Sequence, residues 1–301
     1  MPPWVVVGPG DDAAVVEPER GALDVLKTDA QIEGVHFDRR FVPADAIGYR
    51  ALAVNLSDVA AMGARPRAAL LSLALPDDLD ISVVDGMIDG LLALAARYKV
   101  AVVGGNITRS PGPIMIDVMA TGTVRRRRVL TRSGARPGDE VYVTGLIGEA
   151  AAGLRMLREQ HDASGACVER YLRPDPRVRA GSLLGANRAA TSCVDLSDGL
   201  ADGVAQLSLA SGYGIAIDAD AVPLSDEVRA RLTFDEAIAG GDDYELLFTV
   251  RPSQRGRLRN VRRGVGDLPI TKIGVVTKEP TPVLQSGGQT RALPAGFEHF
   301  R

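Results

Sequence analysis

The chain contains 301 residues, of which 46% are hydrophobic and 24% are charged, a composition typical of a globular protein with about two domains. A net charge of −3 gives no global positive field for nucleic acid, and an aromatic share of 4% leaves few platforms for stacking on bases. We therefore expect neither nucleic acid nor a membrane surface among its partners.

Short β-branched or apolar runs alternate with longer stretches rich in Ala and Leu that have helical periodicity. In chain order, strands are predicted at 5–7, 25–27, 68–75, 100–103, 114–124, 140–144, 215–217, 245–250 and 273–276. Helices are predicted at 44–62, 81–98, 148–159, 179–190 and 199–211, with Asp45 and either Asp80 or Ser82 as start signals. The mixture predicts an α/β or α+β fold.

The segment 130–139 places Gly, Pro and charged residues between two apolar runs, which is typical of a link between domains. We therefore predict an N-terminal domain of residues 1–132 and a C-terminal domain of residues 133–301. Both halves carry a similar acidic sequence, NLSD at 55–58 and DLSD at 195–198, although four letters are too few to show a duplication.

The cysteines and the N-terminal sequence indicate the cellular compartment in which we expect the protein. Cys167 and Cys193 lie far apart and form no CxxC pair, which favours inert thiols over a disulfide framework or a thiolate metal site. The N-terminal sequence MPPWVVVGPGDD lacks a basic region followed by a long apolar one, and no apolar run approaches the ~20 residues that span a bilayer. We expect a cytoplasmic protein.

Five short acidic segments stand out, and most of them follow a predicted strand and precede a turn or helix, where α/β proteins usually bind ligands. They are Asp11-Asp12, Thr28-Asp29, Ser57-Asp58, Asp195-Leu196-Ser197-Asp198 and Asp242-Asp243. Magnesium prefers a few carboxylate ligands together with substrate phosphates, and scattered single Asp residues suit that requirement. The set therefore indicates a site for metal ions and phosphates.

Any one of these acids is more often a turn former or a helix N-cap than a ligand. The hypothesis depends on their number and on our expectation that the chain supplies no neighbouring Lys or Arg to neutralise them. If several converge, they repel one another unless cations lie between them.

Other phosphate-transfer and catalytic devices are absent from the sequence. There is no GxxxxGK[ST] loop and no HRD or DFG signature. His36, His161 and His299 have no mutual spacing that suits zinc, and neither Ser57 nor Ser197 has a nearby His to activate it. The sequence VVGGN at 102–106 is predicted as a strand that runs into a glycine turn, and its signal for phosphate binding is weak.

Seven blocks, taken in order over nearly the whole chain, resemble the thiamine-monophosphate kinase family. They are GDDAAVV (10–16), TDAQIEGVHF (28–37), ALAVNLSDVAAMGARP (51–66), VVGGNITRSPGP (102–113), LTRSGARPGDEVYVTG (130–145), VDLSDGL (194–200) and GGDDYELLF (240–248). The wider superfamily includes aminoimidazole ribonucleotide synthetases, selenophosphate synthetases and a hydrogenase maturation factor. The blocks EGVHF, LSDVAAMGA and GGDDYEL point to the thiamine branch.

The resemblance implies ATP-dependent phosphorylation of thiamine monophosphate to thiamine diphosphate. It implies direct transfer assisted by several Mg²⁺ ions, with no phosphoenzyme and no covalent nucleophile, and this agrees with the missing activated serine. It also implies a two-domain α/β homodimer whose N-terminal domains pair their strands into a shared barrel.

The resemblance also implies roles for individual residues. The expected metal ligands are Asp12, Thr28, Asp29, Asp58, Asn106, Asp195 and Asp198, with Asp11 as a weaker candidate. The expected ATP contacts are Gly105, Asn106, Arg132, Ser197 and Tyr98, and the expected substrate contacts are His36, Asp242 and Phe297.

The chain departs from the family pattern at two site positions. Asn106 stands where the family usually has Asp, which removes a charge and should weaken metal binding there. Asp242 stands where the family usually has Glu, which shortens the carboxylate arm. Two alternatives stay open: another ATP-dependent enzyme of the superfamily, distinguished by His36, Asp242 and Phe297, and a nucleotide-binding protein without turnover.

Overall fold

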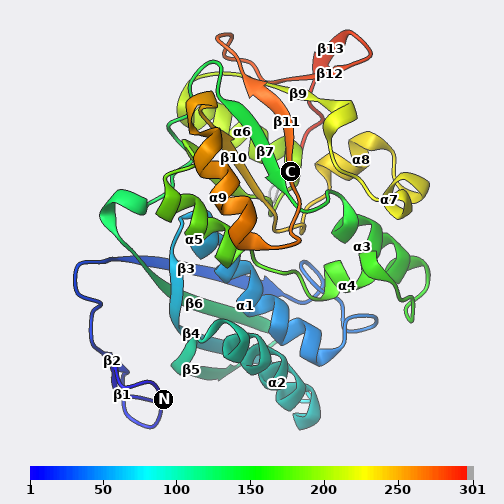
Figure 1. The fold of residues 1–301 in the computed structure, drawn as a ribbon. Helices are drawn as coiled ribbons and strands as arrows, with labels where there is room; N and C mark the ends of the chain where they lie inside the picture. The colour runs from blue at the N-terminus through cyan, green and yellow to red at the C-terminus, as the bar shows by residue number, and fades with distance from the viewer. Residues whose placement is uncertain (297–301) are drawn as a thin grey trace. The chain divides into compact units, whose positions relative to one another are not determined.

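The computed structural model describes residues 1–296 (Figure 1). The chain forms two compact units: unit 1 contains Met1–Val59 and Ala64–Arg126, and unit 2 contains Ala60–Gly63 and the chain from Arg127 on. No helix within the described residues combines the length and the apolar character needed to cross a membrane.

Unit 1 is built on a four-stranded sheet with the strand order β3-β6-β4-β5. Its elements are β1 (Val5–Val7), β2 (Val15–Val16), β3 (Leu23–Ile32), α1 (Ala44–Ala61), β4 (Arg65–Leu75), α2 (Ile81–Tyr98), β5 (Ala101–Arg109) and β6 (Met115–Val124). Strands β4 and β5 run parallel, as the intervening helix α2 requires, and the other pairs of this sheet are antiparallel.

The two faces of this sheet differ in burial. Along β6, Ile116 and Val118 are buried at 1% and 0% exposure, and α1 and α2 cover this face (Figure 1). On the opposite face Leu26, Leu70 and Met115 are exposed by 67%, 36% and 39%. We call this second face the open face of unit 1. Because successive side chains of a strand point to opposite sides, a residue's position in the strand decides which face it joins.

Unit 2 is built on a seven-stranded sheet with the order β13-β12-β9-β11-β7-β10-β8. Its strands are β7 (Glu140–Thr144), β8 (Ser192–Asp195), β9 (Ile215–Asp218), β10 (Leu246–Val250), β11 (Ile270–Val276), β12 (Val283–Ser286) and β13 (Gln289–Ala292). Its α-helices are α3 (Glu149–Glu159), α4 (Ala166–Leu172), α5 (Val178–Asn187), α6 (Leu200–Ser211), α7 (Asp226–Arg231), α8 (Phe234–Ala239) and α9 (Arg255–Val265).

Helices cover both faces of the second sheet, so its central strands β7 and β10 are buried at every position. In β10, Leu247 packs into a core with α6 and α8, whereas Phe248 packs into a second core with α5 and α9. All five residues of β7 and of β10 are buried. This is the pattern expected of strands that lie between two layers of helix.

The mixed α/β fold predicted from the sequence is confirmed. One local prediction is wrong, because Gly104, Gly105 and Asn106 lie inside β5 and not in a turn after it. Several short elements were not predicted, including α4, α7, α8 and the hairpin of β12 and β13. Helix α9 was not predicted either, although its buried residues Leu258 and Val261 have the spacing of one helix face; they are few and lie among arginines.

Glu140 at the start of β7 is a buried carboxylate held by cations. Arg255 donates to both of its oxygens at 2.6 and 2.8 Å, Lys272 lies 2.7 Å from Oε1, and the Tyr142 hydroxyl donates to Oε2 at 3.0 Å. The hydrogen bonds from Arg255, together with Lys272 and Tyr142, outweigh the effect of burial and lower the pKa of Glu140 to about 2.

We predict that Glu140→Gln lowers the free energy of unfolding by about 2 kcal/mol at pH 7. The full value of the pKa shift does not apply, because Arg255 and Lys272 are 62% and 51% exposed. A carboxylate with a lowered folded pKa stabilises the fold above its unfolded pKa of 4.5, and loses that contribution as the pH falls to about 2. The free energies of unfolding of Glu140→Gln and of the unchanged protein, measured in urea from pH 7 to pH 2, should therefore converge in acid.

The exposed control variant Glu279→Gln should leave that pH profile unchanged. Parallel curves for Glu140→Gln and the unchanged protein down to pH 2 would contradict the role given to Glu140.

Candidate functional site

Two carboxylates of unit 1 face one ammonium group. Asp29 on β3 pairs with buried Val118, which places its side chain on the helix-covered face, and Asp58 comes from α1. The Nζ atom of Lys27 lies 2.9 Å from Asp58 Oδ2 and 3.5 Å from Asp29 Oδ2. The expectation that the chain supplies no neutralising cation is therefore wrong. The ammonium group of Lys27 places a positive charge between Asp29 and Asp58.

Thr28 lies on the open face of unit 1, on the other side of β3 from Asp29. It pairs with Met119, and its Oγ1 donates a hydrogen bond to Asp117 Oδ1 at 2.6 Å. Asp117 was not among the predicted site residues. The signal that could have found it is an exposed carboxylate inside the alternating strand MIDVMATG.

Asn106 and Gly105 lie in β5 beside β4. Asn106 pairs with Ser72, which in turn pairs with Asp117, so the three residues form one row across the open face. At position 105 a Cβ atom would lie 1.9 Å from the Leu71 carbonyl oxygen. The close approach of the two strands therefore requires glycine there, whatever ligand it contacts.

The other predicted residues of unit 1 lie in separate local structures. Asp12 is exposed, and its backbone N–H donates to Asp11 Oδ1 at 2.9 Å. His36 Nδ1 accepts from the Ile32 N–H at 3.1 Å, so the proton of a neutral ring is on Nε2. Tyr98 ends α2, and the Arg97 guanidinium lies 5.3 Å from the centre of its ring.

In unit 2 the structure brings the DLSD and GGDD sequences together. The pairing of β8 with β10 continues beyond both strands, because the N–H groups of Asp242 and Tyr244 donate to the Ser197 and Leu196 carbonyls at 2.7 and 2.9 Å. The Leu196 N–H donates back to Glu245 O at 2.9 Å.

The side chains at this junction are mostly acidic. Asp195 is buried at the end of β8, and the Ser197 hydroxyl donates to Asp198 Oδ2 at 2.9 Å. The predicted residues Asp195, Ser197, Asp198 and Asp242 therefore belong to one local structure.

Asp202 in the first turn of α6 is a neighbour that sequence reasoning missed. Burial raises its pKa, and the Asp198 carboxylate raises it further, whereas the Gln206 amide and the Arg132 guanidinium oppose the shift. Arg132, a predicted site residue, therefore lies near enough to Asp202 to lower its pKa. Gly296 packs directly against Asp202. The predicted substrate contact Phe297 lies outside the described residues.

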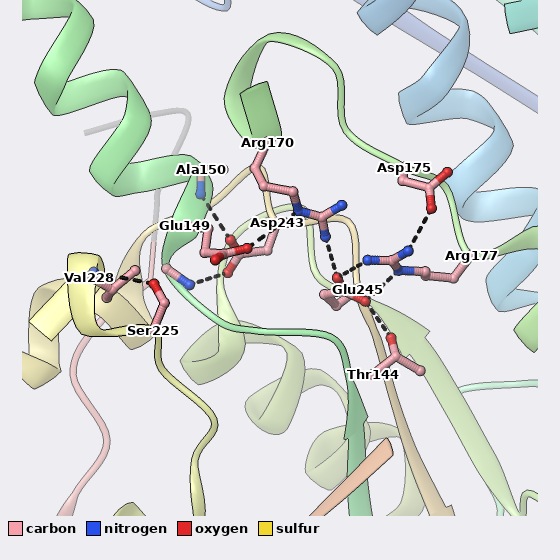
Figure 2. A network of polar contacts seen from close by, with 11 residues as sticks. Thr144, Glu149, Ala150, Arg170, Asp175, Arg177, Ser225, Val228, Asp243 and Glu245 are labelled. Carbon is pink, nitrogen blue, oxygen red and sulfur yellow. Dashed lines mark hydrogen bonds and ion pairs between the residues drawn. The ribbon is translucent and has the colours of Figure 1, made fainter. Parts of the chain in front are cut away.

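Asp243 and Glu245, which follow Asp242 in the sequence, are buried carboxylates (Figure 2). Burial raises the pKa of Asp243 to about 8, although the N–H groups of Gly148 and Ala150 donate to it at 2.7 and 3.3 Å at the start of α3 and oppose the shift. Asp242 and Tyr244 adopt left-handed φ angles of 69° and 49°. Such conformations cost about 1–3 kcal/mol for each residue that is not glycine, so other contacts must hold this segment.

Within residues 1–296, no three His, Cys, Asp or Glu side chains come together as a preformed metal cage. The acidic side chains instead lie in smaller sets. Mg²⁺ commonly binds a few carboxylates together with waters and substrate phosphates, so it does not require a preformed protein cage.

Comparison with known proteins identifies relatives over nearly the full length. Residues 10–124 match the family model "AIR synthase related protein, N-terminal domain", and residues 136–287 match the corresponding C-terminal domain. The thiamine-monophosphate kinase of Escherichia coli strain K12 is 39% identical over 98% of this chain and 92% of its own length.

Two solved structures are also similar. Thiamine-monophosphate kinase from Stenotrophomonas maltophilia K279a aligns with a TM-score of 0.86 and 36% identity, over 95% of this chain and 92% of that one. AaThiL complexed with AMPPCP and TMP aligns with a TM-score of 0.82 and 35% identity, over 97% of this chain and 91% of that one.

The contacts of Lys27 predict how the site responds to divalent cations. Lys27→Met removes the charge between Asp29 and Asp58, and should lower the free energy of unfolding by about 0.5–1 kcal/mol in EDTA, since the three side chains are partly exposed. Added Mg²⁺ should then raise the melting temperature of this variant more than that of the unchanged protein. The exposed lysine variant Lys278→Met is the charge-matched control, and an equal response of all three proteins would contradict the prediction.

Proposed function

Because this chain belongs to the thiamine-monophosphate kinase family, we propose that it transfers the γ-phosphoryl group of ATP to thiamine monophosphate, giving thiamine diphosphate and ADP. The observation that carries the proposal is the full-length similarity to kinases of this name, at 39% identity in the Escherichia coli protein. The similar AaThiL structure, which holds AMPPCP and TMP, supports both ligands.

We propose Mg²⁺ as the cofactor. The proposed ligands are Asp12, Thr28, Asp29, Asp58 and Asn106 in the first unit and Asp195 and Asp198 in the second. The position of the Lys27 ammonium between Asp29 and Asp58 supports the fit, because the same two carboxylates that hold it can hold another cation. Bound Mg²⁺ would neutralise charge on the phosphate oxygens of ATP.

The proposed transfer is direct, with no covalent nucleophile. Ser57 is completely buried, and neither Ser57 nor Ser197 has a His beside it in the sequence to act as a general base. In direct phosphoryl transfer the protein acts mainly by positioning and by stabilising charge.

We assign the remaining residues by the same family comparison. Arg132 would stabilise negative charge on the transferred phosphoryl group. The other proposed ATP contacts are Gly105, Asn106, Ser197 and Tyr98, and the proposed substrate contacts are His36, Asp242 and Phe297.

We also propose that residues 1–132 form the ATP-binding, metal-binding and dimerisation domain, and that residues 133–301 complete the nucleotide and substrate site. The exposed Leu26, Leu70 and Met115 on the open face of unit 1 support a homodimer, since an apolar sheet face without a cover is a candidate interface. A cytoplasmic location, with neither nucleic acid nor a membrane as partner, stays a prediction.

The direct test is a substrate panel. Purified protein with Mg-ATP is incubated separately with thiamine monophosphate, thiamine and aminoimidazole precursors, and the products are separated by chromatography. Thiamine diphosphate formed only from the monophosphate is the expected result. Turnover of a different substrate would favour another enzyme of the superfamily, and ATP binding without turnover would favour a binding protein.

Asp58→Asn is predicted to lower turnover by at least about 100-fold, because it removes one negative charge from the proposed metal site. The melting transition should stay nearly unchanged, since the ion pair with Lys27 that it also breaks is partly exposed. The matched control is Asp89→Asn, which neutralises an exposed carboxylate on α2 and should keep full activity. Full activity of Asp58→Asn would contradict the metal assignment.

A further inference from the structure

The segment from Asp242 to Glu245 has a solvent-accessible part and an anchored part. Asp242 is half-buried and accepts a hydrogen bond from the Tyr244 hydroxyl at 3.0 Å. The three residues that follow it, Asp243, Tyr244 and Glu245, are buried at 3%, 7% and 0% exposure. Two residues of this segment have left-handed backbones, so its shape is maintained by what holds the buried side chains.

Glu245 is held from three directions (Figure 2). Arg177, just before α5, donates through Nε to Oε2 at 2.6 Å and through Nη2 to Oε1. Arg170 of α4 also donates to Oε1, and the Thr144 hydroxyl at the end of β7 donates to Oε2 at 2.6 Å. Arginine forks of this kind fix both the position and the orientation of a carboxylate.

Neighbouring residues lie close around this carboxylate. A Cβ atom at Gly145, whose φ angle is 63°, would lie 2.0 Å from Glu245 Oε1, so the turn after β7 is shaped around the carboxylate. The Thr144 hydroxyl in turn accepts from the Leu246 N–H at 2.8 Å. The start of β10 is therefore fixed on both sides of the Glu245 side chain.

The arginines of this network are themselves held. Arg177 Nη1 donates to Asp175 at 2.6 Å, and Arg170 Nε lies 3.7 Å from the carboxylate of Glu149 at the start of α3. Arg177 and Arg170 are 11% and 19% exposed. Removing the negative charge of Glu245 would therefore leave two mostly buried guanidinium groups without the carboxylate that they share.

We propose that Glu245, clamped by Arg170 and Arg177, is a positioning residue that holds the left-handed Asp242–Tyr244 segment against Ser197 and thereby presents Asp242 to the substrate. This inference rests on the proposed function, since it takes Asp242 as a substrate contact. Glu245 does not touch the substrate in this proposal. It acts through the backbone of the residues before it.

A second buried carboxylate in the same sheet serves as a matched control. Glu140 is 5% exposed and paired with Arg255 and Lys272, and it lies at the opposite end of the β7–β10 strand pair, where it faces Val250. Glu140→Gln and Glu245→Gln each remove one negative charge from a cation-paired carboxylate in one sheet. They differ in that Glu245 alone adjoins the left-handed segment.

The first measurement is hydrogen exchange of backbone amides. In Glu245→Gln, the amides of Asp242 and Tyr244 should exchange at least about tenfold faster, because the bonds to Ser197 and Leu196 open more often. Glu140→Gln should leave both rates unchanged. Unchanged rates in Glu245→Gln, or equal acceleration in both variants, would overturn the proposal without reference to any activity.

The second measurement separates binding from turnover. Glu245→Gln should raise KM for thiamine monophosphate about tenfold or more, with a smaller change in KM for ATP, since a small displacement of a positioned group weakens its contact strongly. Glu140→Gln should leave KM for thiamine monophosphate unchanged. Equal KM values for the two variants would count against Glu245 as a positioning residue.

Arg177→Lys provides a variant that keeps the charge but loses the two-pronged contact. It should show faster exchange and a raised KM for thiamine monophosphate, with both effects smaller than in Glu245→Gln. It replaces Glu245→Gln in the test if that variant does not fold. Arg177→Lys with unchanged exchange and KM would overturn the role of the clamp. If the unchanged protein itself gives no thiamine diphosphate, the proposed function fails, while the exchange measurement still decides whether Glu245 holds the segment.

Discussion

The structure around the acidic residues of unit 2 depends on a backbone pairing that continues past the ends of β8 and β10. Main-chain hydrogen bonds from Asp242 and Tyr244 to Ser197 and Leu196 hold the DLSD and GGDD sequences side by side. Because these hydrogen bonds join backbone groups, they need no attraction among the acidic side chains of DLSD and of Asp242. Carboxylates that would repel one another in a flexible chain are thereby kept together on a fixed frame.

The carboxylates that pair with cations in this protein are neutralised in two ways, which follow their depth. Glu245 and Glu140 are buried, and each is held by an arginine fork. Arginine suits such positions because its planar group binds two oxygens at once. The partly exposed Asp29 and Asp58 instead share the single ammonium of Lys27, a compact charge on a flexible chain that another cation can replace. Carboxylates held permanently by arginine and carboxylates whose cation can be exchanged therefore lie in different parts of the chain.

The sequence predicts those features that depend on local pattern and misses those that depend on distant contacts. Helix α2 was predicted to the residue at Ile81–Tyr98, because Asp80 caps it and its apolar period is strong. Gly105 was expected in a turn, since nothing local shows that the Leu71 carbonyl of another strand requires glycine there. The acids were found in the sequence, but the pairing of Lys27 with two of them became visible only in three dimensions.

The left-handed backbone at Asp242 and Tyr244 has a consequence for how this protein can change over time. Glycine at position 242 would relieve the conformational cost there, so a selection for thermal resistance alone would favour it. At position 244 glycine would instead remove a side chain that is only 7% exposed and would lose its packing. Thermal stability and the proposed substrate contact thus compete for position 242. A more heat-resistant descendant would have to gain its stability elsewhere in the molecule.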